Sequence, residues 1–355
     1  MLLLSTLPPL ALSTYPPSPE DRRPDLDLLS ASRVALYSGR AEQAYRLLLT
    51  ARPEGAPGPD WLDAAARVYV GLDRPLLAAE ALMELGLSDA GARERAVALL
   101  ERQGPGAAHP AFQNLASQPV QTEKKVLKSW TCLLPSPDGN AYVLADTGLS
   151  KVGPSGRVEA VAPLTGGVDL CSDWKGQVVA LGESQLLWGP RRINLPGGLV
   201  KPASVAVTPD GGLVLLDEKQ RRLYRLDEKG NVLGSAPLTL KEPFKVRSDM
   251  AGRIFVADRA SGTVSVFNEG MVPIRVLDPE ARGQKVRKIE ELCVDFAGDV
   301  LLLDGRSRSV FLFSAQGQFL AATGEAWRMD LAGWDGLRGL IYADFKNGVV
   351  RRLRT

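Results

Sequence analysis

The sequence predicts a multidomain chain in which a short helical-repeat segment is followed by a six-bladed β-propeller. Residues 26–102 are rich in Ala, Leu, Glu and Arg, with apolar residues at three- and four-residue steps. About 230 C-terminal residues form short β-rich runs bounded by Gly, Asp and Pro. A strand-and-turn unit recurs there six times, at intervals of 35 to 46 residues. This interval is the length of a four-stranded propeller blade.

Composition places the chain among folded proteins and excludes several kinds of chemistry. Of 355 residues, 45% are hydrophobic and 24% charged, which excludes a disordered chain. The net charge of +2 gives no general attraction to nucleic acid, and no apolar run is long enough to span a membrane. The single histidine, His109, excludes a multi-histidine metal site. Cys132, Cys171 and Cys293 show no metal or disulfide spacing, so we interpret them as buried apolar residues.

The first 25 residues are predicted to be a leader or extended tether. Residues 2–13 form an apolar run followed by small residues, which favours a secretory signal cleaved near Ser13 or Thr14. Against this, no Lys or Arg precedes the run, and Pro8 and Pro9 interrupt it. We expect an extracytoplasmic location, periplasmic or secreted, with the cytoplasm as the alternative.

Five helices are predicted between residues 26 and 102. The first two surround Leu28–Ala35 and Ala41–Leu48, and three more are expected over Asp60–Tyr69, Leu76–Leu85 and from Ser88 or Asp89 to Leu100. The segment GRAEQAYRLLLTARP, from Gly39 to Pro53, resembles the second helix of a tetratricopeptide repeat. The resemblance implies a protein-binding module of helix pairs.

The propeller prediction depends on one recurring strand, exemplified by GLVLLD at 212–217, GRIFVAD at 252–258 and GDVLLLD at 298–304. An Asp ends this strand in five of six units, and we interpret it as an acceptor of backbone N–H groups in the following turn. Gly156, Gly230, Gly270 and Gly317 are expected to take positive φ in the last turn of their units. This layout resembles the NHL-repeat family over residues 124–355, which implies the fold without implying a function.

Residues 103–123, rich in Gly, Ala, Pro and Gln, are predicted to be a linker between the two domains. The sixth unit ends with its third strand, so one strand of the ring has to come from elsewhere. We expect residues 124–130 to supply it as the fourth strand of the last blade.

No cofactor or metal site is expected, because the sequence lacks a G-x-S-x-G motif, a Gly-rich phosphate loop and calcium-loop spacing. Asp169, Glu290 and Glu291 fall near inner strands, where they could meet a cation. The propeller resemblance therefore leaves one enzymatic alternative, a calcium-dependent hydrolase or lactonase acting in the central channel.

The turns that join second and third strands are predicted to form a basic face. They carry Lys151, Lys219, Arg221, Arg222, Arg259, Arg306, Arg308 and Lys346, against Glu183 and Glu218. Either these are solvated turns, or they dock an acidic partner, an anionic glycan or phosphate. Only Phe345 is available for base stacking, which disfavours RNA. We expect a non-catalytic scaffold or adaptor that binds one or more proteins, as part of a bacterial cell-envelope assembly.

Overall fold

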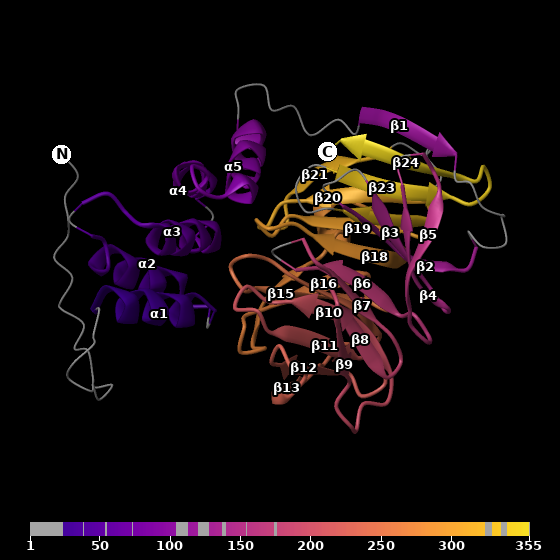
Figure 1. Cartoon of the computed structure of the whole chain (residues 1–355), viewed down its shortest axis with the longest axis horizontal. Helices are drawn as coiled ribbons and strands as arrows, with labels where there is room; N and C mark the ends of the chain where they lie inside the picture. Colours follow the sequence, from indigo (N-terminus) through magenta and orange to yellow (C-terminus); the bar gives the residue numbers. More distant parts are fainter. Residues whose placement is uncertain are drawn as a thin grey trace.

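The computed structural model describes residues 24–37, 39–53, 55–72, 74–103, 113–119, 128–136, 140–153, 155–173, 176–323, 329–334 and 339–354. Within these ranges the chain forms five α-helices and six four-stranded antiparallel sheets, as the sequence predicts. Figure 1 shows the helices gathered on one side of the propeller. Residues 1–23 of the predicted leader, most of the predicted linker and His109 lie outside the described residues.

The five helices lie where the apolar periodicity predicts them. They are α1 (Pro24–Tyr37), α2 (Ala41–Thr50), α3 (Pro59–Gly71), α4 (Pro75–Leu85) and α5 (Ala90–Gln103). Asp89 caps α5, since its Oδ1 accepts hydrogen bonds from the backbone N of Gly91 and Ala92 at 2.9 and 3.2 Å. Asp60 lies in the first turn of α3, whose N-cap is Gly58. The likeness of this segment to tetratricopeptide repeats stays a prediction.

Each propeller blade is one sheet, and five blades use four consecutive strands. Blade 1 contains β2 (Trp130–Pro135), β3 (Ala141–Ala145), β4 (Gly148–Val152) and β5 (Val158–Pro163); blade 2 contains β6 (Asp169–Ser172), β7 (Val178–Leu181), β8 (Gln185–Trp188) and β9 (Arg191–Asn194); blade 3 contains β10 (Pro202–Val207), β11 (Leu213–Asp217), β12 (Arg222–Leu226) and β13 (Val232–Pro237). Blade 4 contains β14 (Pro243–Ser248), β15 (Ile254–Asp258), β16 (Thr263–Phe267) and β17 (Pro273–Leu277); blade 5 contains β18 (Ile289–Val294), β19 (Val300–Asp304), β20 (Ser309–Phe313) and β21 (Phe319–Ala322).

The sixth blade closes the ring with a strand that precedes the first blade in sequence. It contains β22 (Leu331–Trp334), β23 (Gly339–Asp344) and β24 (Val349–Arg354), and β1 (Gln113–Pro119) pairs with the outer side of β24. The predicted closing segment, 124–130, was therefore wrong. Residues 124–127 lie outside the described residues, and Trp130 begins the inner strand of blade 1.

The closing strand was missed because its sequence, QNLASQP, has no apolar alternation. A strand at the outer edge of a sheet can be held by main-chain hydrogen bonds to one neighbour, so it does not require the pattern that marks a buried strand. The general prediction, that an N-terminal strand completes the last blade, is confirmed. The segment that does so lies within the range assigned to a linker.

The Asp at the end of the second strand acts as the sequence predicts in blades 3, 4 and 5. Asp217, Asp258 and Asp304 each accept backbone N–H bonds from two places: their own turn and the segment that enters the inner strand of the same blade. For Asp217 the donors are the backbone N of Val200, Lys201 and Gln220, at 2.6, 3.2 and 2.9 Å. In blade 1 the assignment was displaced by one residue, because Ala145 occupies the equivalent register position and Asp146 is exposed.

One predicted glycine turn is built differently. Gly156, Gly230 and Gly317 have φ of 83°, 89° and 80°, as expected, but in blade 4 the residue with positive φ is Met271, at 59°. The prediction for Gly270 was wrong by one position. The sequence alone could not distinguish them, since both residues lie in the same short turn between β16 and β17.

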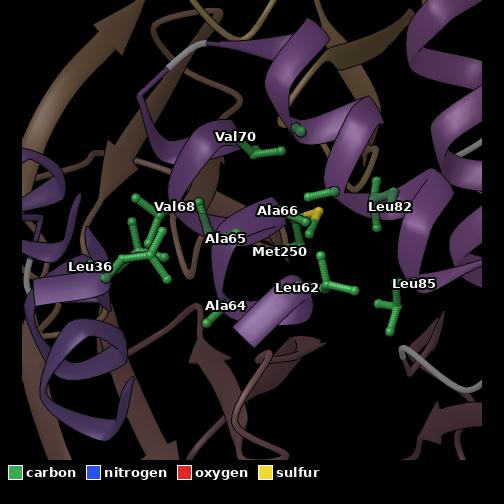
Figure 2. Packing of buried hydrophobic residues seen from close by; sticks show 14 of the residues in the cluster. Leu36, Leu62, Ala64, Ala65, Ala66, Val68, Val70, Leu82, Leu85 and Met250 are labelled. Atoms are coloured by element: carbon green, nitrogen blue, oxygen red, sulfur yellow. The ribbon is translucent and has the colours of Figure 1, made fainter. Parts of the chain in front are cut away.

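The helical segment and the propeller share one hydrophobic core. Met250, Ala251 and Phe296 come from the turns between first and second strands of blades 4 and 5, and they are 3%, 2% and 4% exposed. Figure 2 shows Met250 lying among residues of the helices, near Ala66. The backbone N of Glu269 also donates a hydrogen bond to the carbonyl of Tyr37, at 2.7 Å. The two parts therefore pack as one body.

Candidate functional site

The inner strands of the blades place one residue each in a single layer around the propeller axis. The inner strands β2, β6, β10, β14, β18 and β22 contact one another around the ring. In each blade, one inner-strand residue pairs with the second-strand residue that holds the equivalent register position. We call this layer the channel ring; it consists of Cys132, Asp169, Ser204, Lys245, Glu291 and Leu331.

A β-bulge helps to orient these side chains. In blades 1, 3, 4 and 5 the register of the inner strand shifts immediately before the ring residue, for example between Pro243 and Lys245. A bulge adds one residue to a strand and re-aims the side chains beside it. The same β-bulge is therefore repeated in these four blades, and each blade carries a different side chain at the ring position.

Four charged side chains form a network in the channel. Lys245 Nζ lies between two carboxylates, 2.8 Å from Asp169 Oδ1 and 3.1 Å from Glu291 Oε2. Arg247, from the next layer, donates from Nη1 and Nη2 to the two oxygens of Asp169, at 2.8 and 3.0 Å. Ser204 Oγ and the backbone N of Val205 add two further donors to Asp169 Oδ2, at 2.5 and 3.0 Å. Two acids and two bases are thus paired internally.

Burial and pairing act in opposite directions on these groups. Burial raises the pKa of Asp169, but Arg247 and Lys245 outweigh it and hold that pKa well below its ordinary value. Burial lowers the pKa of Lys245, yet Asp169 holds it above the ordinary value. For Glu291 burial prevails, and its pKa is raised despite Lys245 and Arg247. Asp169 therefore stays ionised, and Glu291 is the more readily protonated of the two acids.

The pairing within the network determines whether a metal cation could bind between Asp169 and Glu291. Asp169 and Glu291 do converge near the axis, as their sequence positions suggested, but the cations they meet are Lys245 and Arg247. Calcium needs six to eight oxygen ligands, and here an ammonium group occupies the space between the two carboxylates. Within the described ranges, no group of three or more His, Cys, Asp or Glu side chains could hold a metal ion. The donor set does not fit calcium.

The three cysteines face the same channel and are buried, as the sequence predicts. Cys132 belongs to the channel ring, and Cys171 and Cys293 lie two residues beyond ring positions. Burial raises the pKa of each thiol to about 12. They are therefore protonated at neutral pH and lack the thiolate character that a nucleophile needs.

The channel ring separates two cavities. One, of about 570 Å³, opens among the turns that join second and third strands and is lined by Lys245, Arg259, Glu290, Glu291 and Asp330, among others. The other, of about 620 Å³, lies between the opposite end of the channel and helices α3 and α5. Lys245 borders the first cavity and Arg247 the second, while Glu291 reaches both.

The predicted basic face is only partly as expected. Lys219, Arg221, Arg306 and Lys346 are exposed in turns between second and third strands, and Arg222 begins β12, where it donates to Ser235 Oγ at 2.8 Å. Arg259 lies over the ring of Phe244, 4.0 Å from its centroid. Arg308 lies 3.5 Å from Asp330, which directly precedes β22, and 3.9 Å from Glu290, which lies at the start of β18. Lys151 does not belong to the face, because it lies within β4, next to Glu159 of β5.

Sequence reasoning missed Ser204, Lys245 and Arg247 as members of the channel site. The available signal was a pair of charges in PFKVRS, an otherwise apolar inner strand. In most blades the ring residue lies two residues into the inner strand. A comparison of this position across all six units would have placed Lys245 beside Asp169 and Glu291.

Comparisons with known proteins agree with the fold. No protein-family model matches the sequence, and no curated protein matches it significantly. A structural-genomics protein of unknown function from Bacteroides thetaiotaomicron is 13% identical, with a TM-score of 0.53 over 69% of this chain and 72% of its own. Virginiamycin B lyase from Staphylococcus aureus (11% identity, 70% and 89% covered) and the Cps50 (Swd1) propeller of Myceliophteria thermophila (9%, 69% and 100%) each score 0.49. At 13% identity, the likeness to the Bacteroides thetaiotaomicron protein shows the fold alone. This chain is a six-bladed β-propeller with an N-terminal helical segment.

Proposed function

We propose that the protein is a non-catalytic scaffold or adaptor whose turn face, the side of the propeller that carries the turns between second and third strands, docks an acidic partner protein. The observation that carries the proposal is the position of the helices. They pack on the opposite side, over the turns that contain Met250 and Phe296. Among the described residues, the turn face is left uncovered and presents Lys219, Arg221 and Arg306 to solvent.

The channel site supports the same proposal. Asp169, Glu291, Lys245 and Arg247 neutralise one another, so the acids and bases nearest the axis are committed to pairing inside the protein. A network of this kind holds the blades together without offering a reactive group. The expected location outside the cytoplasm, in a cell-envelope assembly, is part of this proposal, and sequencing the mature N-terminus tests it.

Charge reversal tests the docking face. Full-length protein is used to capture its partner, and the double variant Lys219→Glu/Arg306→Glu is compared with Arg157→Glu/Lys229→Glu. The control residues are exposed in turns between third and fourth strands, at the opposite end of the blades. We expect the first variant to lose most of the partner and the control to retain it, since reversing a charge at an interface places like charges together. Equal retention by both variants would remove the turn face from the proposal.

A further inference from the structure

The second cavity is a cleft between the helical segment and the mouth of the channel. Its volume of about 620 Å³ is typical of sites for small ligands. From the helices, Asp63 and Arg67 of α3 and the residues around the start of α5 line one side. Inner strands of the propeller, with Phe296 from the turn after β18, line the other side with a largely apolar wall that includes Leu134, Leu170, Val207 and Trp334.

Arg95 is the under-satisfied group of this cleft. Its side chain is 19% exposed, and its buried Nε has no hydrogen-bond partner among the described residues. The nearest acid is Asp89, whose Oδ2 lies 3.7 Å from Arg95 Nη2. Asp89 is held at the N-terminus of α5, where its Oδ1 accepts two backbone hydrogen bonds, so capping keeps it from forming a close pair with Arg95.

Arg67 adds a second positive charge to the same side. Its Nε and Nη2 donate to the carboxylate of Asp63, at 2.8 and 3.1 Å, while Nη1 has no acceptor among the described residues. Burial lowers the pKa of Arg95, and the Arg67 charge adds to that effect while Asp89 opposes it. Two guanidinium groups therefore share a partly buried space with fewer hydrogen bonds than they can make.

The remaining charges of the cleft select the kind of anion that fits. Asp63, Asp89, Glu94 and Asp173 also line it, together with Glu291 and Arg247 of the channel network, which pair with each other. Acids therefore outnumber bases around the cleft, so a dianion such as phosphate meets more repulsion than a singly charged carboxylate. A planar carboxylate matches the donor geometry of a guanidinium. The apolar wall opposite suits a hydrophobic body attached to that carboxylate.

We propose that this cleft binds a monocarboxylate carried on an apolar body, with Arg95 as the group that holds the carboxylate and Arg67 as a second source of positive charge. The carboxylate can belong to a small organic acid or to the C-terminus of a peptide. The cleft lies at the end of the channel opposite the turn face, so this proposal does not depend on the docking surface described above.

Calorimetric titration of the full chain tests the proposal with two pairs of probes. The first pair is 3-phenylpropionate and its amide, and the second is N-acetyl-Leu-Phe with a free or an amidated C-terminus. We expect each acid to bind at least about tenfold more tightly than its amide, because a hydrogen bond to a charged group is stronger than one to a neutral group. Tighter binding of the organic acid points to a metabolite, and tighter binding of the dipeptide acid points to a peptide C-terminus.

A matched pair of variants assigns the binding to Arg95. Arg95→Gln is expected to weaken the acids about tenfold or more. Arg93→Gln, which makes the same charge change on the exposed side of α5 away from the cleft, is expected to leave binding unchanged. The proposal is overturned if acid and amide bind equally, if neither acid binds, if inorganic phosphate binds more tightly than both acids, or if Arg93→Gln weakens binding as much as Arg95→Gln. The acid-to-amide comparison uses the unaltered protein, so it holds even if a variant folds poorly.

Discussion

At the scale of single residues, the channel network shows how buried charge can be tolerated in a propeller. Asp169 is fully buried, and Lys245 and Glu291 are 6% and 7% exposed. Removing such groups from water carries a penalty of several kcal/mol per ion, which pairing offsets only when the geometry is good. Lys245 and Arg247 both contact the two carboxylates, and Lys245 makes the closer contact to Glu291, at 3.1 Å against 3.4 Å.

Lys245→Met is expected to lower the free energy of unfolding by about 3–5 kcal/mol near neutral pH, since it leaves two buried carboxylates to share the single cation Arg247. Urea denaturation of the variant and the wild type measures this difference. The double variant Lys245→Met/Glu291→Gln restores a balanced network, and it is expected to be less destabilised than Lys245→Met alone. A double variant that is less stable than the single one would contradict the compensation described here.

The same variant has a definite pH dependence. Glu291 already has a raised pKa, and loss of Lys245 raises it further, so the folded protein takes up a proton that the unfolded chain does not. Stability relative to the wild type should therefore improve as the pH falls from about 8 to about 5. Asp169 behaves in the opposite way: its depressed pKa stabilises the fold above about pH 4, and that contribution is lost as the pH falls further. A deficit that stays constant across this range would show that Glu291 is not the group that titrates.

Some residue roles were readable from the sequence, and others were not. The turn role of Asp217, Asp258 and Asp304 follows from local chemistry that recurs with each turn, so a repeat in sequence was sufficient. The pairing of Lys245 with Asp169 joins positions 76 residues apart. Only the closure of the ring brings those positions together, so no local pattern could indicate it.

At the scale of elements, the helices were predicted well because burial gives them a clear period, and the second strands because they are continuous apolar runs. The Leu- and Val-rich second strands β11, β15 and β19 are buried at every position. The closing strand β1 carries no such period, and it was assigned to a linker. What defines β1 is its register with β24, from Gln113 opposite Arg354 to Pro119 opposite Val349.

Replacement of residues 113–119 tests this closing strand. A seven-residue Gly-Ser sequence of equal length should lower the thermal midpoint and broaden the transition, because the last blade loses its fourth strand and exposes the edge of β24. A replacement that alternates Thr and Val should recover most of the loss, since β-branched residues favour an extended strand. Differential scanning calorimetry measures both. Equal melting of the Gly-Ser variant and the wild type would show that β1 does not close the ring.

At the scale of the whole molecule, the helices and the propeller form a single platform. Their shared core includes Met250 and Phe296, and the ring of Tyr37 packs against the turn that contains Gly252. A β-carbon at Gly252 would lie 2.6 Å from Tyr37 Cδ1. The equivalent turn of blade 3 contains Gly211, which has open space around the same position. The contact with Tyr37 therefore requires a residue without a β-carbon at position 252 but makes no such demand at position 211.

Gly252→Ala and Gly211→Ala separate backbone strain from domain docking. Both glycines have positive φ, +76° and +87°, so alanine at either site incurs the left-handed penalty of about 1–2 kcal/mol. Gly252→Ala is expected to lose about 1–3 kcal/mol more, because its methyl group overlaps the Tyr37 ring. Chemical denaturation followed by circular dichroism measures the two variants. If Gly211→Ala proves as destabilising as Gly252→Ala, the contact with Tyr37 contributes nothing to docking.

The amino-acid sequence by itself determined the helical segment, the number of blades, the positions of most of their strands and the chemistry of most of their turns. These features depend on periodic burial and on short-range hydrogen bonds, which repeat along the chain. Tertiary structure alone decided that β1 closes the ring, that Lys245 and Arg247 neutralise the acids of the channel, and that the helices cover one mouth and leave Arg95 in a cleft. Each of these depends on contacts between segments far apart in the chain, and such contacts arise only when the sheets are arranged around a common axis.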